Sequence, residues 1–173
     1  MATQNPKRNT RVLLGAIAVI LVAGFFISSL SQSASMSMLG NSMNPTIANG
    51  QKVLVLDGYY ENSPVERGDV VTVKLKTLSD ILVMRVIAIP GDVLDFTEGR
   101  MLLNGAEINE PYLIDSEYLF SDSDLRIIRI PLERVGTVPD NSVFCLNDNR
   151  VIGGDSRTLG FIPVDYLKGK III

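Results

Sequence analysis

The chain has 173 residues, a formal net charge of −3 and a mean hydropathy of +0.25. This length allows one small domain, with or without a membrane anchor. There is no His, no Trp and one Cys, so the sequence excludes a Ser-His-Asp triad, a Cys-His pair, an imidazole zinc site and a disulfide framework. A general base would have to be Lys, a carboxylate, Tyr or metal-bound water. The acidic balance gives no support for nucleic-acid binding.

An uncharged apolar run at residues 12–30 accounts for the high hydropathy. As a helix it would be about 28 Å long, which matches a bilayer core. Basic residues precede it and the first acidic residue of the chain is Asp57, so we expect residues 1–11 in the cytoplasm and residues 31–173 outside the cell. A cleaved signal peptide is the alternative, although its apolar region is usually only about 7 to 15 residues long.

The exported part is predicted to be all-β. Its first stretch, residues 31–46, is uncharged and rich in Ser and Met, which predicts a loop beside the membrane. Short β-branched runs then alternate with turn residues, including a strong hairpin signal at Asn104 and Gly105, and no 3.6-residue apolar period is sustained. We predict strands at residues 53–56, 69–75, 81–89, 92–96, 100–103, 125–130, 142–146 and 170–173.

Some side chains can be placed from this pattern alone. Alternation along residues 69–75 puts Lys74 and Lys76 on a solvated face. Arg85 interrupts an apolar central strand, so it should point to a polar partner or to solvent. Cys145 lies in an apolar run and is expected to be a buried small hydrophobe. Residues 109–124 are acidic and rich in Ser, which is typical of an exposed excursion.

Polar clusters at residues 40–46, 84–92 and 147–163 are the candidate functional segments. Each taken singly is an ordinary turn or loop. Together and in this order they resemble type I signal peptidases, membrane-anchored serine endopeptidases that remove signal peptides from exported proteins. The likeness runs from residue 7 to about residue 170. It comprises the anchor, Ser-Met-x-Pro-Thr at 42–46, Gly-Asp-Val-Val at 68–71, Arg-Val-Ile-x-x-Pro-Gly-Asp at 85–92, Glu-Pro-Tyr-Leu at 110–113 and the Asp-Asn-Arg to Asp-Ser-Arg box at 148–157.

The resemblance implies a fold of coiled antiparallel β-sheets on the outer membrane face, reached by one N-terminal transmembrane helix. It implies signal peptides or extended segments of exported proteins as partners, contact with the lipid bilayer, and neither a cofactor nor a metal. Ser42 corresponds to the nucleophile. The base in this family is a Lys directly before the Arg of the Arg-Val-Ile box, and burial lowers the pKa of that Lys. Met84 stands at this position in this chain. Met can fill the space of a Lys stem but cannot usefully accept a proton.

Two other positions also lack side-chain groups that support catalysis in this family. Gly153 replaces a Ser whose hydroxyl supports the Lys in many members, and Gly40 replaces a residue that can lend a hydroxyl to the oxyanion hole, which leaves the Ser42 amide as donor. Asp155 and Arg157 match the pair that buttresses the site. By resemblance, the substrate-binding region includes Met43, Met84, Val86 and Ile87.

Three explanations of Met84 follow. An engineered Lys-to-Met change leaves Gly153 unexplained, whereas a natural non-catalytic homologue explains both. The third is a replacement base drawn from Lys74, Lys76 or Asp148. We favour a non-catalytic homologue that binds or chaperones exported surface proteins, for example in pilus assembly, over an active or engineered-inactive signal peptidase.

Overall fold

Short strands dominate the described part of the chain, as predicted. The computed structural model describes residues 33–115, 118–121 and 136–173. Its strands are β1 (Ser33–Ser37), β2 (Lys52–Asp57), β3 (Val70–Val73), β4 (Leu82–Ala88), β5 (Val93–Thr97), β6 (Arg100–Leu103), β7 (Ala106–Glu107), β8 (Gly136–Thr137), β9 (Ser142–Leu146), β10 (Ile162–Pro163) and β11 (Leu167–Ile172). The helices are the single turns η1 (Tyr59–Glu61), α3 (Ser156–Leu159) and η2 (Val164–Tyr166).

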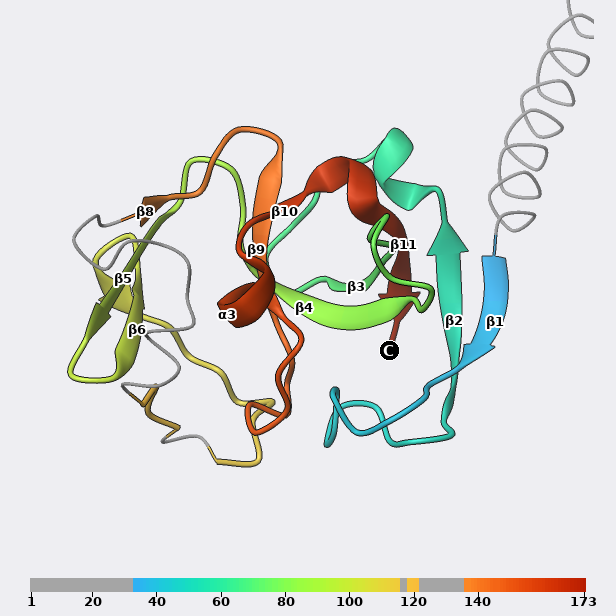
Figure 1. Cartoon of the computed structure of the whole chain (residues 1–173), viewed down its shortest axis with the longest axis horizontal. Helices are drawn as coiled ribbons and strands as arrows, with labels where there is room; N and C mark the ends of the chain where they lie inside the picture. The colour runs from blue at the N-terminus through green and yellow to red at the C-terminus, as the bar shows by residue number, and fades with distance from the viewer. Residues whose placement is uncertain (1–32, 116–117, 122–135) are drawn as a thin grey trace, which may run out of the picture. The chain divides into compact units, whose positions relative to one another are not determined.

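The strands form two sheets. The larger has seven strands in the order β1-β2-β11-β3-β4-β9-β10, and the smaller has four in the order β7-β6-β5-β8. The pairings among β2, β3, β4, β9, β10 and β11 are antiparallel. The prediction of coiled antiparallel sheets is therefore confirmed, and Figure 1 shows the curvature of β4 as it passes between β3 and β9.

Both faces of β4 are covered, which explains its nearly continuous apolar sequence. Val83 packs with Val70 and with Met43 of the loop that carries Ser42, while Met84 and Val86 pack with Val71 and other residues in a second cluster. Successive side chains of a strand point to opposite faces, so the two clusters lie on opposite sides of the sheet. The loop that carries Ser42 therefore covers the Val83 side of β4.

Two expectations about strands were wrong. β3 is not half exposed: it lies between β11 and β4, and Val70, Val71, Thr72 and Val73 are all buried. The alternation argument failed there because Thr72 is small enough to be buried, and its hydroxyl donates to the carbonyl of Gly169. The start of the predicted loop at residues 31–46 is instead the edge strand β1, which its Ser-rich sequence concealed.

The predicted anchor at residues 12–30 and the predicted strand at 125–130 lie outside the described residues. Within the part of the chain that the structure describes, no helix has the length and apolar character needed to cross a bilayer.

Candidate active site

A cavity of about 560 Å³ opens beside Ser42. Its walls are residues 36–39 from the end of β1, residues 79–83 from the turn before β4, Asn147, and the pair Gly153 and Gly154. Leu82 and Val83 supply apolar surface from β4, and Met36 and Met38 supply it from the other wall. The cavity thus combines a serine hydroxyl with apolar walls built by two strands far apart in the sequence.

The loop that carries Ser42 is fixed by its own buried side chains. Met43 and Ile47 are fully buried in the cluster that includes Val83. The carbonyl of Ser42 accepts a hydrogen bond of 2.9 Å from the backbone N–H of Asn149, whose side-chain amide donates to the carbonyl of Asn41. These contacts hold Ser42 beside the segment that follows β9. In the described part of the chain the Ser42 N–H donates to no residue, as an oxyanion donor requires.

A buried ion pair ties this loop to the sheet. Arg85 donates from Nε to Asp148 Oδ1 at 2.8 Å and from Nη2 to Oδ2 at 2.6 Å. The hydroxyl of Thr46 donates to the same carboxylate. Burial works against the charged guanidinium, but the hydrogen bonds and charge of Asp148 outweigh it and raise the pKa of Arg85. The expectation that Arg85 points to a polar partner is confirmed.

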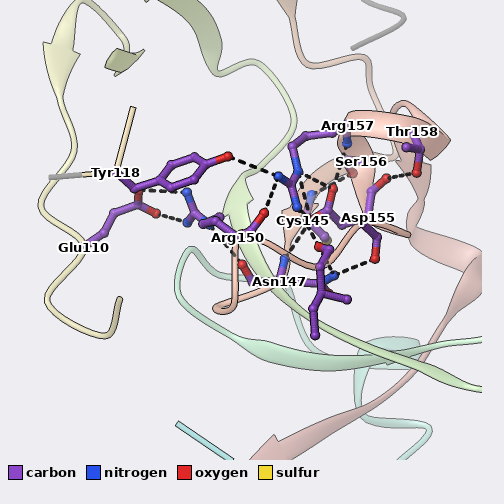
Figure 2. A network of polar contacts seen from close by, with 11 residues as sticks. Glu110, Tyr118, Cys145, Asn147, Arg150, Asp155, Ser156, Arg157 and Thr158 are labelled. Atoms are coloured by element: carbon purple, nitrogen blue, oxygen red, sulfur yellow. Dashed lines mark hydrogen bonds and ion pairs between the residues drawn. The ribbon is translucent and has the colours of Figure 1, made fainter. Parts of the chain in front are cut away.

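Asp155 and Arg157 form a second buried pair (Figure 2), close in sequence to Gly153 and Gly154 of the cavity wall. Asp155 is fully buried; it caps α3 and accepts from Arg157 Nη2 at 2.8 Å. Arg157 also donates to the carbonyls of Arg150 and Ile152, at 2.6 and 2.7 Å. The pair therefore fixes the course of the segment that leads to Gly153.

Asn147 completes this support. Its backbone N–H donates to Asp155 at 3.1 Å, and its side-chain amide donates to the carbonyls of Ile152 and Gly153, both at 3.0 Å. Gly153 has no heavy atom within 4 Å of where a Cβ would stand, and its φ is not in the left-handed region. A larger residue therefore fits at this wall of the cavity.

The 110–113 box reaches the site from outside the large sheet. Glu110 pairs with the buried Arg150, as Figure 2 shows, and accepts the hydroxyl of Tyr112 at 2.5 Å. The guanidinium of Arg85 lies 4.0 Å from the centre of the Tyr112 ring. The excursion predicted at 109–124 is thus anchored at its start. Sequence reasoning gave these residues no role, although they stood in one of the recognised boxes.

Met84 is fully buried, but it does not line the cavity. It lies among Val71, Val73, Val86, Val143 and Cys145. Val86 belongs to the same cluster, and Ile87 packs with Phe144 in another. The structure thus places Val86 and Ile87 in the core rather than at the cavity, where Leu82 and Val83 stand instead. Met43 packs beneath the loop of Ser42. Gly40, next to the cavity, has φ +87°, a conformation that disfavours any side chain.

The residues considered as replacement bases lie elsewhere. Lys74 donates to the carbonyl of Ser79, Lys76 is exposed, and neither lines the cavity. Asp148 is occupied by Arg85 and Thr46. Asp80 is the one ionisable residue among those that line the cavity, and no sequence signal pointed to it.

Cys145 is fully buried, as expected, and burial raises the pKa of its thiol. Among the described residues no group of three or more Cys, Asp or Glu is arranged to hold a metal ion.

The fold and site define a class: a mostly β body, in the part of the chain that the structure describes, with a serine on a loop beside a partly apolar cavity. The family model for signal peptidase, peptidase S26, matches residues 9–173. Signal peptidase I of Bacillus caldolyticus is 30% identical over 174 aligned positions, covering 99% of this chain and 92% of that relative. Signal peptidase IB of Staphylococcus aureus (strain COL) is 28% identical over 162 residues, covering 90% of this chain and 82% of the relative.

The fold also has a match among solved structures. The crystal structure of a signal peptidase I from Enterococcus faecalis V583 superposes with a TM-score of 0.51 at 23% identity, covering 64% of this chain and 98% of that one. The chain belongs to the signal peptidase family, peptidase S26, a family of serine peptidases.

Proposed function

We propose that this chain binds extended segments of exported proteins at the cavity beside Ser42 and does not cut them. Family membership gives signal peptides as the class of segment. The observation that carries the proposal is that the described walls of this cavity contain Ser42 but no Lys, and that the residue at the expected base position is the buried Met84. Deleting one member of a nucleophile and base pair lowers turnover by a factor on the order of 10⁴.

Unpaired strand edges on both sides of the cavity support the binding half of the proposal. β1 is the edge strand of the large sheet, and β4 pairs with β9 only from Arg85 onward, so one edge of Leu82 and Val83 has no strand partner. An extended segment can add to such edges through backbone hydrogen bonds while its side chains enter apolar pockets. Peptide binding of this kind requires no general base.

The proposal includes the setting of this site. Residues 12–30 would cross the membrane once, with residues 1–11 in the cytoplasm and the β body outside the cell. Exported surface proteins, such as pilus subunits during assembly, would then reach the cavity as they leave the membrane. The missing base and Gly153 are natural features in this proposal rather than an engineered change.

The test is a cleavage and binding assay on the full chain in membranes. A precursor with a signal peptide is incubated with the unmodified chain, with Met84→Lys and with Met84→Lys/Gly153→Ser, and each is paired with its Ser42→Ala counterpart. We expect no cleavage by the unmodified chain and co-purification of the precursor with it. Cleavage by a Lys variant that disappears in its Ser42→Ala counterpart would show that the new amine reaches Ser42 from the opposite face of β4. Gly153→Ser is a sound variant because the added side chain meets open space.

Cleavage by the unmodified chain that disappears in Ser42→Ala would overturn the proposal and favour an active peptidase. In that case loss of cleavage in Asp80→Asn would identify Asp80 as the base, since it is the one carboxylate among the residues that line the cavity.

A further inference from the structure

We infer that Asp80 makes the cavity selective for segments that carry a basic side chain. This inference rests on the proposed function and adds a charge preference to it. Asp80 precedes β4 and lines the cavity together with Ser42, Ile81 and Leu82. The remaining wall residues are uncharged, so Asp80 is the one charged side chain among the residues that line the cavity.

The Asp80 carboxylate is free to bind a ligand. Its hydrogen bond within the described chain is a long one, 3.5 Å from the hydroxyl of Ser79. The nearby Lys74 donates to the carbonyl of Ser79, and no ion pair joins any described basic residue to Asp80. Asp80 differs in this from the buried or half-buried carboxylates Asp148, Asp155 and Glu110, which have arginine partners.

A bound segment can bring a cation to this position. Asp80 lies three residues before Val83, and three residues of extended chain span at most about 11 Å. A segment paired along Leu82 and Val83 therefore reaches Asp80 within a few residues. A Lys or Arg there would pair with the carboxylate, and Arg could do so through two parallel hydrogen bonds.

The solvent exposure of Asp80 sets the size of the preference for a basic side chain. Asp80 is exposed at the rim, so its pair with a ligand cation has the strength of a surface ion pair. That corresponds to an affinity gain of about threefold. Salt screens such pairs, so the gain should shrink at about 0.5 M salt. The cavity still discriminates by the sign of the charge, because the Asp80 carboxylate would repel a Glu at the position where it attracts a Lys or Arg.

The experiment measures binding of fluorescent peptides to the full chain in detergent micelles. All peptides share one sequence of small residues, except for a single position that carries Lys, Gln or Glu. In one set this position lies three residues before the centre of the peptide, and in the other set it lies three residues after the centre. In one of the two sets, we expect the Lys peptide to bind about threefold more tightly than the Gln peptide. In the same set, the Glu peptide should bind more weakly than the Gln peptide. Asp80→Asn should abolish these differences, so that the Lys, Gln and Glu peptides bind to it with equal affinity.

Asp140→Asn is the matched control, because Asp140 is also exposed and has no part in the cavity walls. It should retain the full preference for Lys. A preference that persists in Asp80→Asn, or equal binding of the three peptides by the unmodified chain, overturns the inference while the proposed binding function stands. If the unmodified chain binds none of the peptides and no precursor, the proposed function itself fails.

Discussion

Arg85 and Asp148 form a two-contact ion pair that joins the middle of β4 to the loop after β9, with side chains 10% and 0% exposed. Thr46 donates to the same carboxylate, and the Tyr112 ring covers the guanidinium. Four segments distant in sequence thus meet at one charge pair. The position of the Ser42 loop therefore depends on a contact that is not itself in the cavity.

We predict that breaking this pair destabilises the whole β body. Asp148→Ala leaves the guanidinium of Arg85 buried without its partner, which should lower the free energy of unfolding by about 3–5 kcal/mol. Denaturant unfolding of the full chain measures this change. Glu107→Ala is the control, because the pair of Arg100 and Glu107 is about half exposed on both sides, and it should cost less than about 1 kcal/mol. Equal losses in the two variants would contradict the role assigned to Asp148.

Met84→Lys should restore the family residue at a cost in stability. The new amine would lie among Val71, Val73 and Val86, where burial disfavours the ammonium form and lowers its pKa. The unfolded chain then binds more protons than the folded one, so the variant should gain stability as the pH rises from about 7 towards 10. Thermal unfolding at several pH values tests this. Met84→Leu is the control and should show no such pH dependence, because it introduces no titratable group.

The sequence predicted the strands with strong β-branched runs well. Residues 100–103 and 142–146 match β6 and β9, because their turns are marked by Gly, Pro and Asn. β1 and the short strands β7, β8 and β10 could not be predicted, since their residues gain strand geometry only from neighbours far away in the chain. The residues of the candidate active site were likewise predictable only where the sequence itself marks them. Ser42, Gly153, Asp155 and Arg157 followed from the motif boxes, whereas Asp80 lies in no motif and became relevant only when the fold brought its turn to the cavity.

Substitution by Ala should lower the stability of the protein at Gly169 and leave it nearly unchanged at Gly153. A Cβ at Gly169 would meet the carbonyl oxygen of Leu56 at 2.6 Å and Cγ1 of Val55 at 2.7 Å, because β11 lies closely against β2. Gly169→Ala therefore forces the strands apart and should lower the free energy of unfolding by about 2 kcal/mol or more. Gly153→Ala meets open space and should change stability by less than about 0.5 kcal/mol. Denaturant unfolding of both variants checks this, and a destabilised Gly153→Ala would contradict the geometry of the cavity wall.

Asp92 should make stability fall in acid. Burial alone would raise the pKa of this carboxyl, but hydrogen bonds from Arg67, Asn104 and the backbone N–H of Ile89 prevail and lower it to about 2 from an ordinary 3.8. A depressed pKa in the folded state contributes stability that is complete above about pH 5 and is lost as the pH falls towards 2.

The shift corresponds to about 2 kcal/mol. Asp92→Asn should thus be less stable than the unmodified chain by about this amount at pH 7, and the difference should narrow between pH 5 and pH 2. Denaturant unfolding across this pH range measures the difference. Asp140→Asn serves as the exposed control and should follow the unmodified chain at every pH, because its side chain lies in solvent with no described ion pair. A difference between Asp92→Asn and the unmodified chain that is the same at pH 7 and pH 2.5 would show that the loss comes from packing at position 92 rather than from the charge of the carboxylate.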